Sequence, residues 1–263
     1  MKPRKPLKVF FSVIKALFLR ELEMRMSVGK SGLFWTFAEP FLQVFVFVSI
    51  HAAITKLNGH TSSTYEPTVF MAVGFIAYNM FKNILTSSLG AFEANKGLFN
   101  YKQVKPIDTI IARALVNLFF TIIIYFLFLI IGFLLHIDNL LPKNPIMVFV
   151  GFIWLFIFSI GIGLLAAIGN SFYISIGKFI NSISFVLLIG SAIFFPIVSL
   201  PSFAQKFFLY NPLVHFMEMI HGYYLYGLDD RFVDYKYMAL WTIVPLFIGL
   251  WLYVRLERRI ISL

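Results

Sequence analysis

Long apolar runs divide this 263-residue chain into segments that each match the thickness of a membrane. An α-helix of about 20 residues crosses the roughly 30 Å of hydrocarbon in a bilayer, and it satisfies its backbone hydrogen bonds internally. Hydrophobic residues make up 60% of the chain and charged residues only 13%, which excludes an ordinary soluble domain. We therefore expect an all-α integral membrane protein. Hydropathy predicts six transmembrane helices, at residues 33–54, 69–89, 110–135, 146–168, 179–200 and 238–254.

The positive residues are distributed unevenly between the two sides that six spans define. The side that holds the N-terminus carries 16 lysines and arginines, whereas the loops on the opposite side carry five. Positive residues mark the cytoplasmic side, so both termini are expected in the cytoplasm. The net charge of +10 then follows from topology, and no nucleic-acid partner is expected.

Residues 7–26 are expected to form a helix that lies along the cytoplasmic membrane surface. Lys8, Ser12, Lys15 and Glu23 fall within one arc of this helix, while apolar residues fill most of the rest. The alternative is a plain juxtamembrane tail held by anionic lipid. The expected domains are a cytoplasmic tail at 1–32 and a six-span transmembrane domain at 33–263.

The tripeptide Gly29-Lys30-Ser31 resembles the end of a phosphate-binding loop. The glycine that such a loop requires five positions before Gly29 is Met24 here, and no strand precedes it. The chain is therefore not expected to be an enzyme or to hold a cofactor of its own. Cysteine is absent, so a disulfide framework and a thiolate metal site are excluded.

The polar loop between the second and third spans, residues 90–109, carries more chemistry than a connector needs. Its stretch 96–108 holds three lysines, two aromatics that are expected to be exposed and one proline. Such a stretch is expected to contact something outside the membrane. The alternative is a solvated connector whose lysines only follow the topology rule.

Two charged side chains fall within apolar segments. Glu39 precedes Pro40 near the start of the first span, where a carboxylate is costly and proline kinks a helix. It either serves a gate or polar pathway, or pairs with a nearby lysine or arginine. Lys82 in the second span either snorkels to the interface or faces a watery or paired environment.

The segment 192–227 stays apolar although three prolines interrupt it. It is too broken to span and too apolar for an ordinary loop, so short re-entrant helices on the outer side are expected. Within it, His215, Glu218 and His221 recur at three-residue spacing, near one helical face. Such a cluster resembles a metal site, but in so aromatic a chain it more often satisfies itself or lines a polar path.

Four stretches together resemble one family. They are SGLFWTFAEPF (31–41), LFNYKQVKPIDTIIAR (98–113), SAIFFPIVSLP (191–201) and NPLVHFMEMIHGYY (211–224). The family is the membrane permease of bacterial capsular polysaccharide ABC exporters, in the ABC-2 superfamily. The order and spacing match over nearly the whole chain, and the second stretch is specific. One position departs from the family pattern, because His221 stands where arginine is expected; this puts an obligate pair between Glu218 and a cation in doubt, although a protonated histidine also serves.

The resemblance implies six transmembrane helices, an N-terminal interfacial helix and re-entrant helices before the last span. It also implies a homodimer that binds two copies of a separate cytoplasmic ATPase, which holds ATP and Mg²⁺. With periplasmic and outer-membrane export proteins, such a complex moves a lipid-linked, usually acidic polysaccharide across the bacterial inner membrane.

The resemblance further implies that the polar loop is the coupling helix through which the ATPase acts. Its expected coupling residues are Lys96, Phe99, Tyr101, Lys102, Gln103, Lys105, Pro106 and Asp108. Aromatic walls and some positive charge suit a canal for an acidic polysaccharide, since sugar faces stack on rings. The canal candidates are Trp35, Phe37, Glu39, Phe45, Tyr78, Phe81 and Lys82.

Other functions remain open. O-antigen and teichoic-acid permeases share the superfamily architecture. An ion-coupled secondary transporter would use Glu39, Lys82 and Glu218, although the chain has no clear internal repeat. A membrane-embedded transferase would need a catalytic cluster, for which only His215, Glu218 and His221 qualify.

Overall fold

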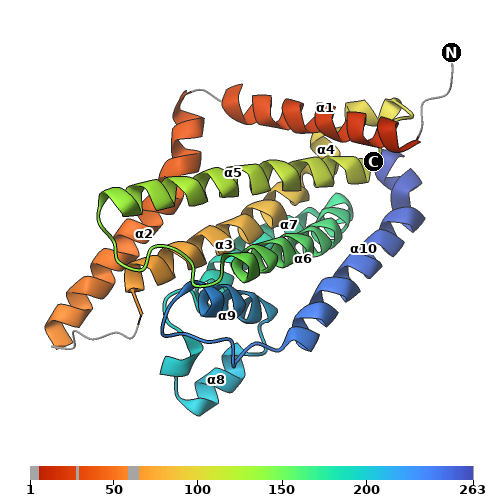
Figure 1. Ribbon diagram of the computed structural model, residues 1–263. Coiled ribbons are helices and arrows are strands. Elements are labelled where there is room, and N and C mark those ends of the chain that lie inside the picture. Colours follow the sequence, from red (N-terminus) through yellow and green to blue (C-terminus); the bar gives the residue numbers. More distant parts are fainter. Residues whose placement is uncertain (1–5, 28–29, 59–64, 263) are drawn as a thin grey trace.

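The computed structural model describes residues 6–27, 30–58 and 65–262, and all the regular elements in these ranges are helical (Figure 1). Residues 1–5 of the expected tail and Gly29 of the tripeptide lie outside the described residues. The long helices are α1 (Pro6–Ser27), α2 (Lys30–Asn58), α3 (Pro67–Leu89), α5 (Pro106–Leu134), α6 (Pro145–Phe172), α7 (Ile174–Ile189) and α10 (Tyr235–Ser262). The short ones are α4 (Ala91–Ala94), η1 (Lys96–Asn100), η2 (Ile197–Ser199), α8 (Ser202–Phe208) and α9 (Pro212–Tyr224).

Four helices are long and apolar enough to cross a membrane, namely α3, α5, α6 and α10. They correspond to the second, third, fourth and sixth predicted spans, which are confirmed at this level. In α2 the apolar stretch Phe37–Ile50 is shorter, and so is the whole of α7. The expectation of six spans therefore stays a prediction.

The fifth predicted span is wrong in its boundaries. The helix α7 ends at Ile189, whereas the predicted span continues to residue 200. The backbone N–H of Gly190 bonds to the carbonyl of Val186 at 2.9 Å and closes the helix. Farther on, Pro196 has extended backbone angles, so the chain there is not α-helical. Hydropathy alone counted these apolar residues as helix.

Three helices begin with the same N-cap arrangement. In α3, α6 and α9 a proline occupies the first turn, and the preceding side chain of Glu66, Asn144 or Asn211 accepts a backbone N–H of that turn. Proline suits this position because its missing N–H would have no partner there. The sequence thus determines where these helices start.

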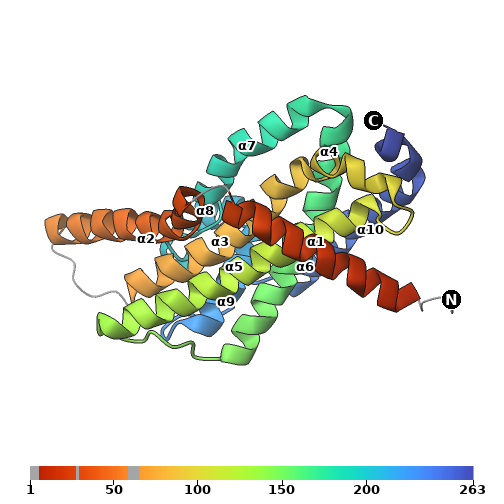
Figure 2. The same ribbon diagram turned by 90° about the horizontal axis from the view of Figure 1, so that it is seen from above.

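Helix α3 lies at the centre of the molecule. Of its most apolar stretch, 83% is buried, against 28–44% for α5, α6 and α10. It packs against α2, α5, α6 and α9 (Figure 2). Small residues allow the close approaches, since a Cβ added at Gly163 of α6 would meet the Ser88 hydroxyl oxygen at 2.8 Å.

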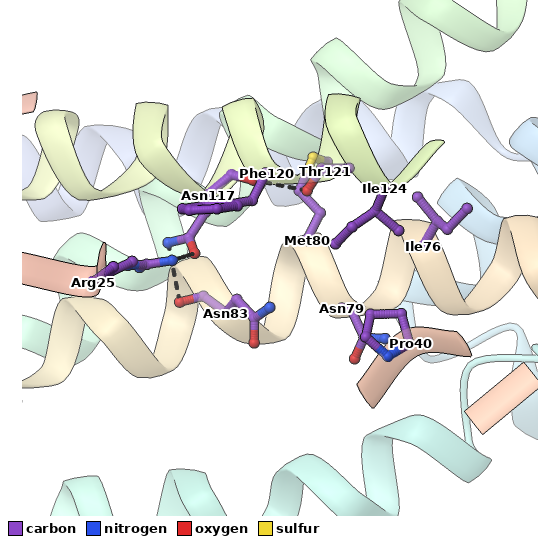
Figure 3. A pocket seen from close by; sticks show the side chains of 10 residues that line it. All are labelled: Arg25, Pro40, Ile76, Asn79, Met80, Asn83, Asn117, Phe120, Thr121 and Ile124. Carbon is purple, nitrogen blue, oxygen red and sulfur yellow. Dashed lines mark hydrogen bonds between the residues drawn. The ribbon is translucent and has the colours of Figure 1, made fainter. Parts of the chain in front are cut away.

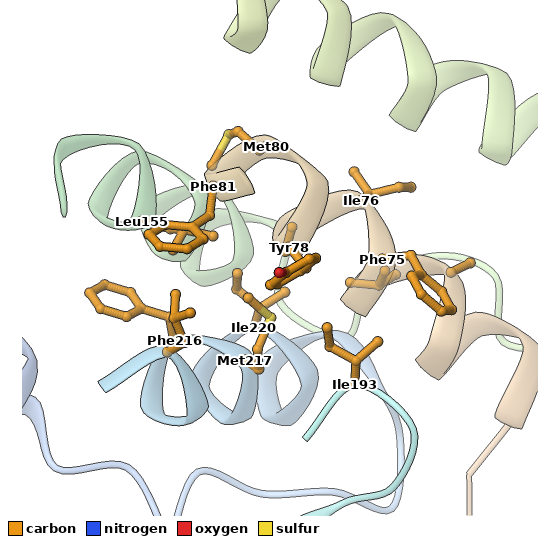
Figure 4. Packing of buried hydrophobic residues seen from close by; sticks show 14 of the residues in the cluster. Phe75, Ile76, Tyr78, Met80, Phe81, Leu155, Ile193, Phe216, Met217 and Ile220 are labelled. Atoms are coloured by element: carbon orange, nitrogen blue, oxygen red, sulfur yellow. The ribbon is translucent and has the colours of Figure 1, made fainter. Parts of the chain in front are cut away.

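The segment predicted to be re-entrant contains η2, α8 and α9. Nearly all of α9 is buried, and Phe216, Met217 and Ile220 face Tyr78 of α3 and Leu155 of α6 (Figure 4). The α8 turn lies at the opposite end of the molecule from α4 and the end of α10 (Figure 1). The short helices are therefore confirmed, while their re-entrant placement in a membrane stays a prediction.

Candidate functional site

The predicted coupling region folds as two short turns, α4 and η1, which join α3 to α5. Tyr101 is 66% exposed. The expected coupling residues that are exposed are Lys96, Tyr101, Lys102, Gln103 and Lys105, and we call these five residues the basic tip. They present four polar or charged groups and one ring to a partner.

The expected exposure of Phe99 is wrong. Its side chain is only 7% exposed and belongs to a buried cluster with Ile110, Leu164 and Tyr253. This cluster joins η1 to α5, α6 and α10, so Phe99 fixes the loop to the helices behind it.

Pro106 and Asp108 are also buried rather than available to a partner. The Asp108 carboxylate accepts the backbone N–H of Lys105 at 2.9 Å and caps the start of α5. The expected coupling residues thus divide into the exposed basic tip and three buried residues, Phe99, Pro106 and Asp108.

Helix α1 lies across α3 and α5 (Figure 2), and three arginines hold it there. The Arg113 Nε lies 3.3 Å from Glu21 Oε2 in an ion pair whose side chains are 12% and 13% exposed. Arg113 also donates to the Ser87 carbonyl at 2.6 Å. From α1, Arg20 donates to the side-chain oxygen of Asn95 at 2.6 Å. These residues were not predicted from the sequence, although the charges of Arg20 and Glu21 interrupt an apolar helix and were a usable signal.

A small polar cavity of about 20 Å³ lies where α1, α2, α3 and α5 meet (Figure 3). Arg25 enters it from α1 and donates to Asn117 Oδ1 at 3.0 Å. Burial lowers the pKa of the Arg25 guanidinium, while Glu21 opposes that shift. Asn79 and Asn83 line the same cavity from α3. The cavity therefore places polar groups of three helices, α1, α3 and α5, around one point, while α2 contributes the ring of Pro40.

A shallow, open groove of about 540 Å³ runs along the exposed face of α2, between side chains of this helix, and we call it the α2 groove. Trp35 at its end is 58% exposed. The lining residues are Trp35, Glu39, Leu42, Gln43, Val46 and Phe47.

Polar side chains connect this groove to α3. The Lys82 Nζ lies 3.0 Å from Glu39 Oε1, so Glu39 pairs with a basic residue and Lys82 lies in a paired environment. Gln43 donates to the same oxygen at 3.4 Å, and its own Oε1 accepts from Asn79 at 2.8 Å. The two intramembrane charges expected from the sequence are thus brought together, and two amides that were not expected join them.

The other canal candidates occupy different environments. Tyr78 and Phe81 are buried in the core, where the Tyr78 hydroxyl donates to the Ser184 carbonyl and the Phe81 ring stacks on Phe158 (Figure 4). The prediction that they face a canal is therefore wrong for the structure of this chain. The remaining aromatics, Phe37 and Phe45, are half-buried and exposed respectively, and neither lines the α2 groove.

The three polar residues of α9 do not form one cluster. Glu218 accepts the backbone N–H of Ile197 at 3.1 Å, and His221 Nε2 lies 3.1 Å from the Phe70 carbonyl. His215 Nε2 instead lies 2.9 Å from the backbone carbonyl of Leu209, the residue that follows α8. In the described part of the chain, no three His, Asp or Glu side chains are arranged to hold a metal ion. The pair between Glu218 and residue 221 is likewise not formed.

Comparisons with known proteins give matches over nearly the full length. The model of a family described as ABC-2 type transporter matches residues 12–225. The polysialic acid transport protein KpsM of Escherichia coli is 34% identical over 249 residues, which cover 95% of each chain. The capsule polysaccharide export inner-membrane protein BexB of Haemophilus influenzae is 32% identical over 227 residues, 85% of this chain and 82% of BexB. CtrC of Neisseria meningitidis serogroup A, which carries the same description, is 28% identical over 252 residues, 94% and 92% of the two chains.

Proposed function

The chain belongs to the ABC-2 type transporter family, and from that premise we propose that it exports capsular polysaccharide across the bacterial inner membrane. The observation that carries the proposal is the match to KpsM, which spans 95% of both chains. BexB and CtrC, whose descriptions name capsule polysaccharide export and the inner membrane, support the same cargo and location.

In this proposal the chain is a permease subunit without a nucleotide site. It works as a homodimer with two copies of a separate cytoplasmic ATPase, which supplies ATP hydrolysis with Mg²⁺. The cargo is a lipid-linked acidic polysaccharide, and periplasmic and outer-membrane export proteins receive it. Helices α2 and α7 serve as the first and fifth spans, both termini are cytoplasmic, and α8 and α9 re-enter from the outer side.

The basic tip is the proposed contact with the ATPase. Its exposed ring and lysines suit a groove with acidic walls. Behind the tip, Phe99 ties η1 to α6 and α10, and the pair between Arg113 and Glu21 ties α5 to α1. A displacement of the tip would therefore move several helices together, which is what a coupling element must do.

The α2 face is the proposed side of the canal. Glu39 and Lys82 are 54% and 26% exposed, and such groups are costly against lipid. A water-filled path between two copies of the chain removes that cost. The exposure of these two charges supports a canal at the dimer interface, with Trp35, Glu39 and Lys82 on its wall.

The test is reconstitution into proteoliposomes with and without the candidate ATPase. We expect polysaccharide to stimulate ATP hydrolysis, and polysaccharide to cross only when both proteins and ATP are present. A flux that needs no ATPase and follows a pH gradient would instead identify an ion-coupled transporter.

A further inference from the structure

We propose that Trp35, Glu39 and Gln43 form a binding subsite for one sugar ring of the polysaccharide, on the exposed face of α2. This inference rests on the proposed function, because it assigns a place on the chain to the cargo. It also adds Gln43 and Asn79, two residues that sequence patterns did not single out.

The three side chains share one face of the helix. Trp35, Glu39 and Gln43 follow each other at four-residue intervals, so each lies about one turn above the last. All three line the α2 groove, whose remaining wall is apolar. A pyranose ring has an apolar face of C–H groups and a rim of hydroxyls. The indole of Trp35 suits that face, and a carboxylate and an amide suit the rim.

The polar groups retain capacity for a ligand. Among the described residues, the bonds from Lys82 and Gln43 to the Glu39 carboxylate both end on Oε1. Neither bond uses the other oxygen, Oε2, and a carboxylate oxygen can accept a hydrogen bond from a sugar hydroxyl. Gln43 Oε1 is occupied by Asn79, which is only 5% exposed. Asn79 is therefore a positioning residue that fixes which way the Gln43 amide points.

The charges suit an acidic polymer. Lys82 neutralises Glu39 at 3.0 Å, so the subsite presents no net negative charge to a uronic or sialic acid unit. A lipid chain is the poorer occupant, because it would leave the carboxylate and the amide facing hydrocarbon. A helix of the second copy is the other possible occupant, and the experiment below separates it from a sugar.

The native chain contains no cysteine, so a single introduced thiol reports one position. Leu42→Cys places a thiol inside the α2 groove, and Ile50→Cys places one on the same helix outside it. The two native side chains are matched, since each is 49% exposed. The labelling rate with a small maleimide is measured in the intact exporter, in membranes of cells that make the polysaccharide and of cells whose synthesis is blocked.

We expect polysaccharide to slow labelling at Leu42→Cys by about fivefold, because a bound ligand buries most of a groove of this kind. Labelling at Ile50→Cys should not change. Equal rates at Leu42→Cys in the two membranes would overturn the subsite, whether both are fast, as with lipid, or both slow, as with a second copy.

A functional measurement complements the labelling. Trp35→Ala should lower the export rate about fivefold at equal membrane level, through loss of the stacking face. The matched control is Trp251→Ala, which removes a tryptophan of similar exposure, 51%, from α10. If the unmodified chain exports and Trp35→Ala exports equally well, the subsite is wrong while the exporter stands. If the unmodified chain supports no ATP-dependent export, the proposed function itself fails.

Discussion

At the scale of single residues, partly buried arginines hold α1 in place. Arg113 is the most connected of them, because it contacts Glu21 of α1 and the Ser87 carbonyl of α3 from its own position in α5. An ion pair this buried contributes through the cost of breaking it, since removal of one partner leaves the other charge without compensation.

Arg113→Ala should therefore lower the free energy of unfolding by about 3 kcal/mol. The control is Arg231→Ala, because Arg231 pairs with Asp229 at the same 3.3 Å but the side chains are 58% and 60% exposed. That exposed pair should add little stability. Thermal unfolding in detergent measures both variants, and an equal loss in the two would contradict the role given to the buried pair.

Asp230 provides a pH-dependent test in the loop before α10. Hydrogen bonds from Tyr235 at 2.6 Å and Tyr223 at 2.7 Å hold the pKa of its carboxyl below the ordinary value. A carboxyl with a lowered folded pKa stabilises the fold above its unfolded pKa, and the contribution disappears as the pH falls through the folded pKa. As the pH falls below about 4, the unfolding temperature of Asp230→Asn should consequently drop less than that of the unmodified chain. If the unfolding temperatures of the two chains fall in parallel with pH, this role of Asp230 is refuted.

At the scale of elements, the loop between α3 and α5 separates structural from partner-facing residues. Phe99 and Tyr101 are two positions apart and chemically similar, yet one is 7% and the other 66% exposed. Their substitutions should accordingly have different effects.

Phe99→Ala should cost about 3 kcal/mol of stability, since it leaves a cavity in a buried cluster. Tyr101→Ala should leave the unfolding temperature unchanged and reduce export in cells. Thermal unfolding and surface polysaccharide, measured on the same two variants, provide the check. Normal export by Tyr101→Ala would remove this ring from the coupling surface.

Hydropathy and local signals were sufficient for much of the fold. They located α3, α5, α6 and α10, because long uncharged runs have few alternatives. They misplaced the end of α7, because the apolar residues after Gly190 pack without continuing this α-helix. Periodicity also could not tell that Phe99 turns inward, which depends on contacts with Leu164 and Tyr253 far away in the sequence.

The sequence also predicted part of the candidate site. Glu39 and Lys82 stood out because charge is rare in such segments, and the structure pairs them. Asn79 and Gln43 carry no charge, so only their contact across two helices reveals them. Tyr78 and Phe81 were assigned to a canal by residue type alone, and their burial follows from the central position of α3.

At the scale of the whole molecule, the exposed basic tip and the α2 groove are connected through α3. The tip follows the C-terminal end of this helix, and the Lys82 and Asn79 contacts to α2 lie along it. Since α3 is enclosed by α2, α5, α6 and α9, a movement at its C-terminal end would reach the α2 groove without an intermediate element.

The most direct test of this account measures ATP hydrolysed and polysaccharide transported in the same proteoliposomes. Lys102→Glu reverses one charge on the basic tip, and Lys236→Glu is the matched reversal at the start of α10. We predict that Lys102→Glu retains ATP hydrolysis but moves about tenfold less polysaccharide per ATP, a typical size for the loss of a coupling interaction. Lys236→Glu should keep the unmodified ratio. An unmodified ratio in Lys102→Glu would contradict the claim that the ATP cycle enters the permease through this tip.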